Sequence, residues 1–508
     1  MALADSMNLI KNNLNINLDK IFKFFLILHV LVWSILPLVR QILPIDALEC
    51  VYWGSLIDFG TNKHPPLAGW IAYFVHNNFG KNDFVIYLLG QVSVIIGFIY
   101  LYKLGKLFIS KTASFLAVMI MEASFVYTYM GIYDGFNPNF LLLAFLPMIT
   151  YYFYKSVYEE SLWNWVKLGI FVGLSFLAKY QTLMLFIPLF IFLLITPSGR
   201  KQFKKKGFYI AVLIALLVLL PHIIWLFNNN FFSFNYFIVC EDRYATFYHG
   251  PLKYIWSPFV FLFNQFIAVI GVAFIYFTAL WFSKEKISKN ENAKPEDKIF
   301  LILCGVVPVF LQSINGLSGN YMIPQWGYSL LFMSGILLFY FFPFKLSDKA
   351  IKYMLAWVLG AMLITLSVLT IVFTTEKNFA NRFCVQDVTE IIEQIYEKET
   401  GKKMKYIGGF IELSIPLTHY NNGKYIVVLD TYSHPNIWID YDDLKKSGVI
   451  ILGRDFLLMD KYIQATVPNI AEKPKVKDFK FVVKNVIGTE RVYKMYYAIV
   501  YPNAKYND

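Results

Sequence analysis

The chain has 508 residues, of which 57% are hydrophobic and only 16% charged, and its mean hydropathy is +0.51. Soluble domains carry roughly 25% charged residues, and even large ones leave much of their surface in water, so this composition excludes a water-soluble protein. The formal net charge is +12. Much of the positive charge lies in short segments between apolar runs rather than on one soluble face, which argues against nucleic-acid binding. The composition predicts an integral membrane protein.

Eleven apolar runs are long enough, at about 17–25 residues, to cross a bilayer as helices. Lys and Arg are several times more frequent in the segments that lie inside when the N-terminus is inside, as the positive-inside rule requires. An odd number of spans then leaves the C-terminus outside. Only Lys179-Tyr180 separates the fifth and sixth runs, so ten and twelve spans remain alternatives. The predicted spans lie near residues 21–39, 84–102, 113–131, 138–154, 162–178, 181–196, 208–227, 257–282, 299–315, 321–343 and 351–374.

The chain divides into a membrane domain, residues 1–375, and a smaller domain, residues 376–508, whose composition is that of a soluble protein. In the smaller domain, a 3.6-residue periodicity after Val385 predicts an amphipathic helix, and three short apolar runs predict buried strands. We expect a small α/β domain on the outer side. Two outer loops, 40–83 and 228–256, are much longer than the other loops. Because such loops carry functional residues, we expect them to form the active-site face.

Charged residues that could act in catalysis or bind a phosphate lie in the first outer loop. Asp46 and Glu49 are three residues apart, which places both carboxylates on one helix face. A general base beside a supporting carboxylate can activate a hydroxyl, and two solvated loop acids are the alternative. Lys63 and His64 precede a Pro-Pro helix start, where cations and unpaired N–H groups suit a phosphate. An interfacial lysine that anchors a surface helix is the alternative there.

Together with three later segments, these residues resemble a known family. The segments are G-L-S-F-L-A-K-Y-Q-T-L-M-L-F-I-P at 173–188, L-L-P-H-I-I-W-L-F-N-N-N-F-F-S-F at 219–234 and N-Y-M-I-P-Q-W at 320–326. With Asp46…Glu49 and K-H-P-P-L-A-G-W, they stand in the order found in membrane glycosyltransferases of the GT-C fold that use polyprenyl-phosphate sugars. The chain resembles the protein O-mannosyltransferases and the bacterial lipid A aminoarabinose transferases over roughly residues 20–375.

The resemblance implies roles for four residues. Asp46 matches the catalytic acid of the family, although the family often has two adjacent acids where this chain has Asp46 and Glu49 separated. Lys63 matches the basic residue that meets the lipid phosphate, and Tyr321 matches a tyrosine that hydrogen-bonds the same phosphate. Lys179, with Tyr180, matches a Lys-Tyr pair of the family at an outer helix junction. A lysine that only snorkels to the membrane surface explains Lys179 equally well.

Physical arguments add further residues. Glu122 lies within a predicted span, where a charge costs roughly 2.5–3.5 kcal/mol, so it is protonated, paired within the bundle or lines the cavity. Asp134 and Asn137 lie in an outer turn and could bind a sugar hydroxyl, a plain turn being the alternative. Arg243 in the second long loop is a further phosphate cation or a member of a local surface ion pair. A disulfide among Cys50, Cys240 and Cys384 is conceivable, with free thiols as the alternative.

The sequence therefore predicts an inverting glycosyltransferase of the bacterial inner membrane that acts at the periplasmic face. The expected donor is a sugar on undecaprenyl phosphate, and the expected acceptor is lipid A or lipopolysaccharide. A protein hydroxyl is the alternative acceptor, and a flippase of lipid-linked sugars without chemistry is the alternative function. We expect a monomer that needs no cofactor. A divalent cation bound by Asp46, Glu49 and His64 is the alternative.

Overall fold

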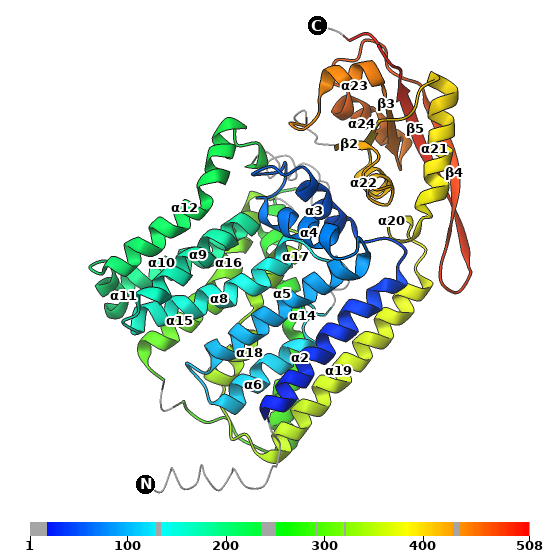
Figure 1. Ribbon diagram of the computed structural model, residues 1–508. Helices are drawn as coiled ribbons and strands as arrows, with labels where there is room; N and C mark the ends of the chain where they lie inside the picture. Colours follow the sequence, from blue (N-terminus) through cyan, green and yellow to red (C-terminus); the bar gives the residue numbers. More distant parts are fainter. Residues whose placement is uncertain are drawn as a thin grey trace, which may run out of the picture.

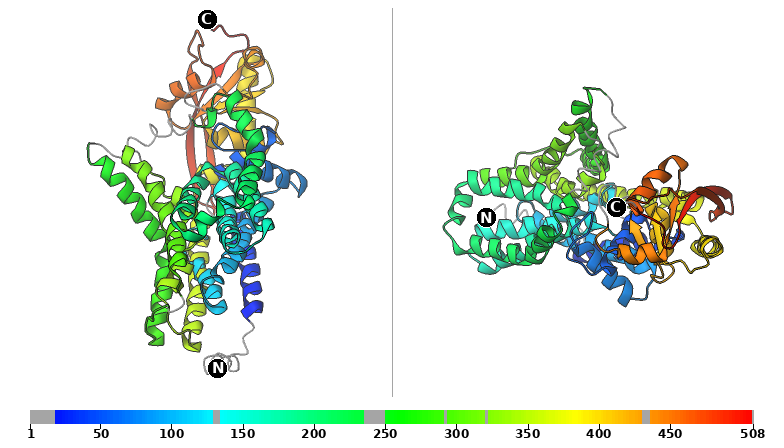
Figure 2. Two further views of the ribbon diagram at one scale, coloured as in Figure 1. Left: turned by 90° about the vertical axis from the view of Figure 1, so that its left-hand side faces the viewer. Right: turned by 90° about the horizontal axis from the view of Figure 1, so that it is seen from above.

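A computed structural model of the chain describes residues 18–128, 134–234, 250–290, 293–319, 322–429 and 436–506. A bundle of apolar helices forms the membrane part, and a smaller domain with a β-sheet lies beyond one end of the bundle (Figure 1). Seen from above, the smaller domain covers the N-terminal helices and leaves the side formed by α9–α12 uncovered (Figure 2). The chain is thus a polytopic helical membrane protein with a small C-terminal α/β region.

Seven helical segments within the described residues are long and apolar enough to cross a membrane. They are Leu18–Val39 (α2 with η2), Asp83–Gly105 (α5), Pro138–Tyr158 (α8), Lys206–Asn228 (α12), Lys253–Ser283 (α14), Pro295–Ser318 (α15, α16 and η6) and Asp348–Thr375 (α19). Two shorter apolar helices are Leu162–Ala178 (α9) and Tyr180–Ile195 (η4 with α10).

The predicted count of eleven spans is not confirmed, because two predicted spans are interrupted. The run 113–131 begins as α6 (Lys111–Met119) and continues as the 3-10 turn Ile120–Ala123 (η3), after which Ser124 has an extended backbone. The run 321–343 contains the short pieces Gln325–Tyr328 (α17), Ser329–Leu331 (η7) and Ser334–Phe341 (α18).

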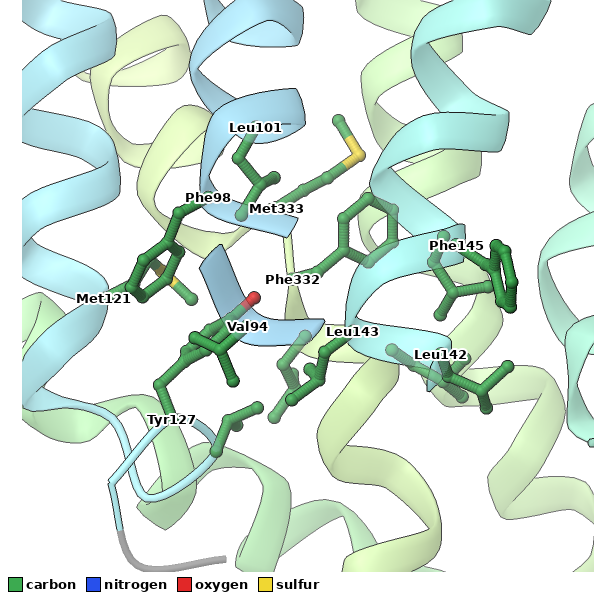
Figure 3. Packing of buried hydrophobic residues seen from close by; sticks show 14 of the residues in the cluster. Val94, Phe98, Leu101, Met121, Tyr127, Leu142, Leu143, Phe145, Phe332 and Met333 are labelled. Carbon is green, nitrogen blue, oxygen red and sulfur yellow. The ribbon is translucent and has the colours of Figure 1, made fainter. Parts of the chain in front are cut away.

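Close helix contacts hold the bundle together. A Cβ on Gly97 of α5 would lie 2.3 Å from the carbonyl oxygen of Leu143 on α8, and one on Gly335 of α18 would lie 2.1 Å from that of Ala117 on α6. Small residues at such contacts let backbones approach, which drives helix association within lipid. Side chains from α5, α8 and the segment before α18 then fill the space between these helices, as Figure 3 shows for Val94, Phe98, Leu101, Leu142, Leu143, Phe332 and Met333.

Two shorter helices lie between α2 and α5 in the chain, at the same end of the bundle as the smaller domain (Figure 1). They are Ile45–Ser55 (α3) and Leu67–Asn78 (α4), which confirms that the first long loop contains two helical stretches, the second beginning at the Pro-Pro pair. The two helices touch at glycines: a Cβ on Gly54 would lie 2.0 Å from the carbonyl oxygen of Gly69. This contact fixes how the residues of α3 face the loop that precedes α4.

The C-terminal domain is a five-stranded sheet in the order β2-β1-β3-β5-β4, in which β1 is parallel to β2 and β3, and β5 is antiparallel to β3 and β4. The three predicted strands are present as β1, β2 and β3 and the predicted amphipathic helix as α21, whereas the long hairpin β4–β5 was not predicted. The bounds are Phe379–Arg382 (α20), Val385–Thr400 (α21), Tyr406–Gly409 (β1), Ile411–His419 (α22), Ile426–Leu429 (β2), Tyr441–Ser447 (α23), Val449–Gly453 (β3), Phe456–Leu458 (η8), Met459–Thr466 (α24), Val476–Lys484 (β4) and Glu490–Val500 (β5).

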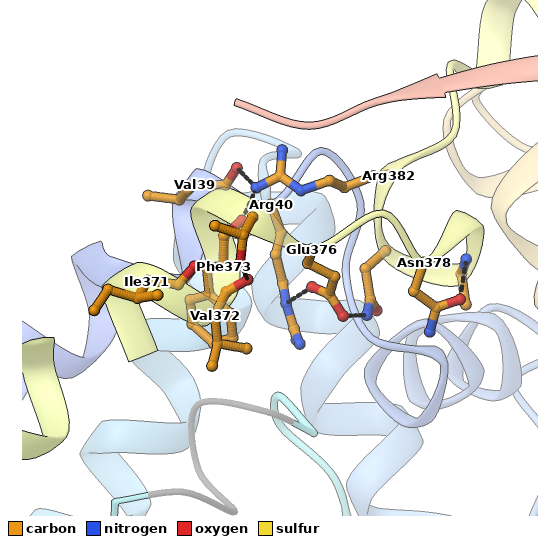
Figure 4. A network of polar contacts seen from close by, with 11 residues as sticks. Val39, Arg40, Ile371, Val372, Phe373, Glu376, Asn378 and Arg382 are labelled. Carbon is orange, nitrogen blue, oxygen red and sulfur yellow. Dashed lines mark hydrogen bonds and ion pairs between the residues drawn. The ribbon is translucent and has the colours of Figure 1, made fainter. Parts of the chain in front are cut away.

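A polar junction ties the C-terminal domain to the ends of the first and last spans (Figure 4). Arg382 on α20 donates hydrogen bonds to the carbonyl oxygens of Val39 and Phe373, the former at 2.9 Å. Arg40, which follows η2, lies with its Nε 3.4 Å from Glu376 Oε2 and its guanidinium 4.3 Å from the centre of the Phe373 ring. The side chain of Arg40 is 1% exposed, so this junction is a buried one.

The domain also contacts α3 directly. The Tyr52 hydroxyl donates to the carbonyl oxygen of Val427 at 3.0 Å and accepts from the Val427 N–H at 3.3 Å. Because β2 is an edge strand of the sheet, α3 satisfies backbone groups that the sheet leaves unpaired. Tyr420 donates to Asp83 at 2.9 Å and accepts from the Leu43 N–H at 2.7 Å. The C-terminal domain is therefore held against α3 and the start of α5.

Candidate functional site

The N-terminal half of α3 presents two carboxylates with different exposures. Pro44 caps the helix with an extended backbone, so Asp46 and Glu49 lie in successive turns. The Glu49 side chain is 6% exposed and the Asp46 side chain is 45% exposed. One carboxylate is thus buried in the protein, and the other is available to a substrate.

Lys63 lies between the two acids. Its Nζ donates to Glu49 Oε2 at 2.8 Å and is 3.8 Å from Asp46 Oδ1. The Thr61 side chain shapes the loop, because its Oγ1 accepts from the N–H groups of Lys63 and His64 and donates to the His64 carbonyl oxygen. The structure therefore brings together Asp46, Glu49 and Lys63, as the sequence hypothesis requires.

The segment before Lys63 is fixed from the opposite side by α12. His222 donates to the Phe59 carbonyl oxygen at 2.6 Å and accepts from the Tyr180 hydroxyl at 2.8 Å. A Cβ on Gly60 would lie 2.3 Å from the Trp225 ring, so the loop backbone packs flat against that indole. These contacts join the first outer loop to the Lys179-Tyr180 junction.

Lys179 lies at that junction with a buried side chain. Its Nζ donates to Asn139 Oδ1 at 2.6 Å. Burial lowers the pKa of Lys179 to about 7; the negative charge of Asp46 opposes this and the positive charge of Lys63 adds to it. Lys179 is therefore close enough to both residues to share their electrostatic field, and its charge changes near neutral pH.

His64 packs edge-on against Trp53, with ring centres 5.6 Å apart. Burial lowers the pKa of His64 well below its usual value, and the charges of Lys63 and Lys179 lower it further. The imidazole is therefore neutral at pH 7. In this arrangement the two lysines, rather than His64, supply positive charge.

The turn before α8 approaches the start of α3. A Cβ on Gly135 would lie 2.9 Å from the Ala47 Cβ, and the φ angle of Gly135 is +63°. Burial, aided by the charge of Asp46, raises the pKa of Asp134 to about 7. Asn137 caps α8 by accepting from the Asn139 N–H at 2.9 Å. Asp134 thus lies near Asp46, and Asn137 is connected through Asn139 to Lys179.

One predicted site residue, Glu122, is not brought to this cluster by the structure. Glu122 lies in the bundle, fully buried, and accepts hydrogen bonds from His29 at 2.7 Å and Trp33 at 2.6 Å, which is the pairing that the sequence allowed as an alternative. Arg243 and Tyr321 lie outside the described residues.

The cysteines form no disulfide within the described residues. Cys50 and Cys384 are free thiols, the first buried and the second exposed. Cys240 lies outside the described residues. No group of three His, Cys, Asp or Glu side chains that could hold a metal ion occurs in the described ranges.

Two residues of the C-terminal domain that the sequence did not indicate also belong to this region. Burial raises the pKa of Glu412 on α22; the Arg454 guanidinium opposes the rise, and the charge of Asp46 adds to it. Glu412 is therefore within electrostatic reach of Asp46. No local motif marks Glu412 or Arg454, because only the docking of the domain onto α3 brings them there.

Several buried polar atoms at the site have no hydrogen-bond partner. They are Trp53 Nε1, Asn62 Oδ1 and Asn137 Nδ2. Native proteins leave few such groups unsatisfied, and those that remain call for a ligand, water or ion. Their position beside Lys63 and before α8 is consistent with a site for a polar substrate.

An apolar cavity of about 350 Å³ lies between α9, α10 and α12. Its lining is formed by hydrophobic side chains and includes Phe176, Phe186 and Leu219. Phe176 lies about one turn before Lys179 on α9, and Leu219 lies about one turn before His222 on α12. One end of the cavity therefore lies about one helical turn from the polar junction that adjoins Lys63, and the rest extends along α9 and α12 as far as Trp165 and Phe208.

Comparison with known proteins identifies similar sequences. Residues 63–225 match the family described as dolichyl-phosphate-mannose-protein mannosyltransferase. The chain is 25% identical over 188 residues to the lipid A galacturonosyltransferase RgtD and 21% identical over 212 residues to the lipopolysaccharide core galacturonosyltransferase RgtA, both of Rhizobium johnstonii. These alignments cover 36% and 41% of this chain, and 38% and 41% of the relatives.

A solved structure of the Archaeoglobus fulgidus oligosaccharyltransferase aligns with 92% of this chain and 73% of that chain, at 11% identity and a TM-score of 0.39. A similarity of that size supports no inference. The sequence matches do confirm that the chain resembles membrane glycosyltransferases. The region 63–225, which matches the family, contains Lys63, Asp134 and Lys179.

Proposed function

We propose that this protein is a membrane glycosyltransferase that moves a sugar from a polyprenyl phosphate to lipid A or lipopolysaccharide. The reaction takes place at the outer face of the bacterial inner membrane, with inversion at the anomeric carbon. One observation carries the proposal: on α3, a buried Glu49 holds Lys63 beside the exposed Asp46. A carboxylate and a cation are thus positioned together for the two ends of a transfer reaction.

In this mechanism Asp46 acts on the acceptor. An acceptor hydroxyl is deprotonated by Asp46 as its oxygen attacks the anomeric carbon, and the bond from that carbon to the phosphate oxygen breaks. An acceptor phosphate is already ionised, so Asp46 then acts by orientation alone. Glu49 cannot take this role equally well, because it is buried and accepts a hydrogen bond from Lys63.

Lys63 and Lys179 act on the leaving group. The leaving lipid phosphate gains negative charge as the sugar departs, and fixed cations in a partly dry site stabilise that charge. Both lysines lie within electrostatic reach of Asp46, so the phosphate and the acceptor nucleophile can occupy adjacent positions. Arg243 and Tyr321 remain proposed contacts of the same phosphate.

A lipid-linked donor is supported by the cavity between α9, α10 and α12. An apolar space whose end lies about one turn from Lys179 suits a molecule with a long hydrocarbon chain and an anionic head. The matched family is described by a dolichyl-phosphate donor, which is a carrier of this type. The named relatives act on lipid A and the lipopolysaccharide core, which makes galacturonic acid the first sugar to test and lipid A the first acceptor.

The experiment uses the purified full-length protein in proteoliposomes with a synthetic polyprenyl-phosphate sugar and lipid A. Release of free polyprenyl phosphate together with glycosylated lipid A is the expected result. The Asp46→Asn variant should lose it, and Asp58→Asn, a half-buried acid elsewhere in the same loop, is the matched control that should keep it. Movement of intact donor between leaflets, without release of lipid phosphate, would show a flippase and overturn the proposal.

A protein acceptor is the second candidate, because the matched family is described as mannosyltransferases of proteins. The same assay with a Ser- and Thr-rich peptide in place of lipid A distinguishes the two. Transfer to the peptide alone would keep the donor chemistry and replace the acceptor.

A further inference from the structure

The hairpin formed by β4 and β5 extends beyond the rest of the sheet toward the outer end of α19 (Figure 1). Two hydrogen bonds hold it there. Asn485 Nδ2 donates to the carbonyl oxygen of Thr375, the last residue of α19, at 3.0 Å, and the Tyr493 hydroxyl donates to that of Lys377 at 2.7 Å. The hairpin tip is therefore fixed at the level where the last span ends.

At the outer end of α19 one helix face packs on the end of the first span through Leu369 and Phe373, and the opposite face is exposed. Only 17% of its most apolar window is buried within the molecule. Val368 and Ile371, in the last two turns, are 53% and 62% exposed. An apolar helix surface of this kind is covered by acyl chains, so the hairpin tip lies at the boundary between acyl chains and headgroups.

The residues at the tip are unusual for a turn. The backbone carbonyl oxygen of Asn485 accepts a hydrogen bond from the Gly488 N–H at 3.1 Å. Val486 and Ile487 are therefore the two central residues of a β-turn. Such positions favour Gly, Pro, Asn, Asp and Ser, and a water-exposed turn gains nothing from β-branched apolar residues. Val486 is 55% and Ile487 63% exposed, so both side chains point away from the protein.

The outward face of the hairpin carries one apolar pair between charged pairs. Val482 on β4 pairs with Val492 on β5, and both are exposed, at 43% and 62%. Lys480 pairs with Lys494 on the same face, farther from the tip. The exposed ion pair of Lys484 with Glu490 lies on this face between the valine pair and the turn. The side chains that reach farthest from the protein toward the hydrocarbon are therefore those of the turn itself, while the long lysine side chains can extend toward phosphate groups.

We propose that the tip of the β4–β5 hairpin, Val486 and Ile487, inserts into the lipid leaflet at the outer end of α19. The C-terminal domain then has a membrane anchor separate from its contacts with α3 and from the bonds of Arg382 to the ends of the first and last spans. Because the anchor acts on the domain that places Glu412 near Asp46, it holds that domain at a constant height above the site. The inference does not depend on which reaction the site performs.

The test places an environment-sensitive label on the full-length protein. Ile487→Cys, in a background with Cys240→Ser and Cys384→Ser, is labelled with a nitrobenzoxadiazole dye in vesicles of phosphatidylethanolamine and phosphatidylglycerol. We expect blue-shifted emission that loses most of its intensity with lipids spin-labelled on the acyl chain and little with aqueous iodide. The matched control, Lys403→Cys just beyond the far end of α21, should show the reverse.

Quenching of the Ile487 label by iodide and not by lipid would overturn the proposal. Resistance to both quenchers would do so as well, because it would show contact with protein. A second arm places the label at Val492 and compares the native tip with Val486→Asn and Ile487→Asn together. We expect the polar tip to raise iodide quenching at Val492 several-fold, and an unchanged value would contradict insertion.

Discussion

The ion pair between Lys63 and Glu49 can be separated into its structural and chemical contributions by three variants. Lys63→Met removes the cation but keeps the length of the side chain, and it leaves the Glu49 carboxylate, 6% exposed, without the donor at 2.8 Å. Glu49→Gln removes the charge of the acid. The double variant removes both charges and leaves neither group as a buried unpaired ion.

The expected change in stability follows from burial. Breaking a fully buried ion pair costs about 3–5 kcal/mol, but Lys63 is 19% exposed and Asp46 is 3.8 Å away. We therefore expect a loss of about 1.5–3 kcal/mol in Lys63→Met, which is the range of a charge-assisted hydrogen bond. The double variant should recover most of that stability, because replacing both partners of a buried ion pair by uncharged side chains often leaves the free energy of unfolding unchanged.

The expected change in activity is different. If Lys63 stabilises the leaving phosphate, its loss lowers kcat/KM for the donor by roughly 10- to 150-fold, the kinetic equivalent of about 1.5–3 kcal/mol. That loss should persist in the double variant, whose stability has recovered. Thermal denaturation and donor kinetics on the same preparations measure both quantities.

The outcome that refutes this reasoning is recovery of kcat/KM together with stability in the double variant. Lys63 would then serve only to neutralise Glu49. Normal kinetics in folded Lys63→Met would lead to the same conclusion.

Four further outcomes are expected. Asp46→Asn should reduce turnover at least about 100-fold, in the range of a lost general base or electrostatic contact, with unchanged thermal stability, and normal turnover would exclude Asp46 as the base. Since the pKa of Lys179 is about 7, its positive charge is lost as pH rises through neutrality, so donor kcat/KM should fall above pH 7, and Lys179→Arg should flatten that pH profile. Gly54→Ala should lower stability by about 1–3 kcal/mol through overpacking, because the new Cβ would lie 2.0 Å from a carbonyl oxygen of α4; an unchanged melting temperature would contradict the close helix contact. An impermeant thiol reagent on spheroplasts should label Asn422→Cys and not Lys205→Cys, because exporting the basic loop opposes the charge bias that sets topology, and the reverse pattern would place the site at the cytoplasmic face.

Local patterns in the sequence were sufficient for the membrane character, the two helices of the first outer loop and the α/β character of the C-terminal region. Long apolar runs, a proline pair and alternating apolar residues each act over a few neighbouring residues, so they can be recognised without knowing the fold. The same locality made Asp46, Glu49 and Lys63 recognisable, because all three lie within one loop.

The hairpin β4–β5 shows where local patterns were insufficient. Its inward residues, such as Phe481 and Val483, alternate with charged or exposed ones. The hairpin joins the rest of the sheet through the pairing of β5 with β3, and these two strands are far apart in the chain. The interruption of two predicted spans was likewise not recognisable from hydropathy, which measures how apolar a run is and not whether its backbone stays helical.

The roles of the individual site residues depended on contacts between distant segments. Lys179 enters the site because α9 ends beside Asn139 and the loop of Lys63, and Glu412 enters it because Tyr52 pairs with the edge of β2. Residue type and spacing specify which groups a segment carries, whereas burial and neighbouring charges from other segments decide which carboxylate is exposed and which lysine titrates near neutral pH. These environments exist only after the helices have packed and the C-terminal domain has docked on α3.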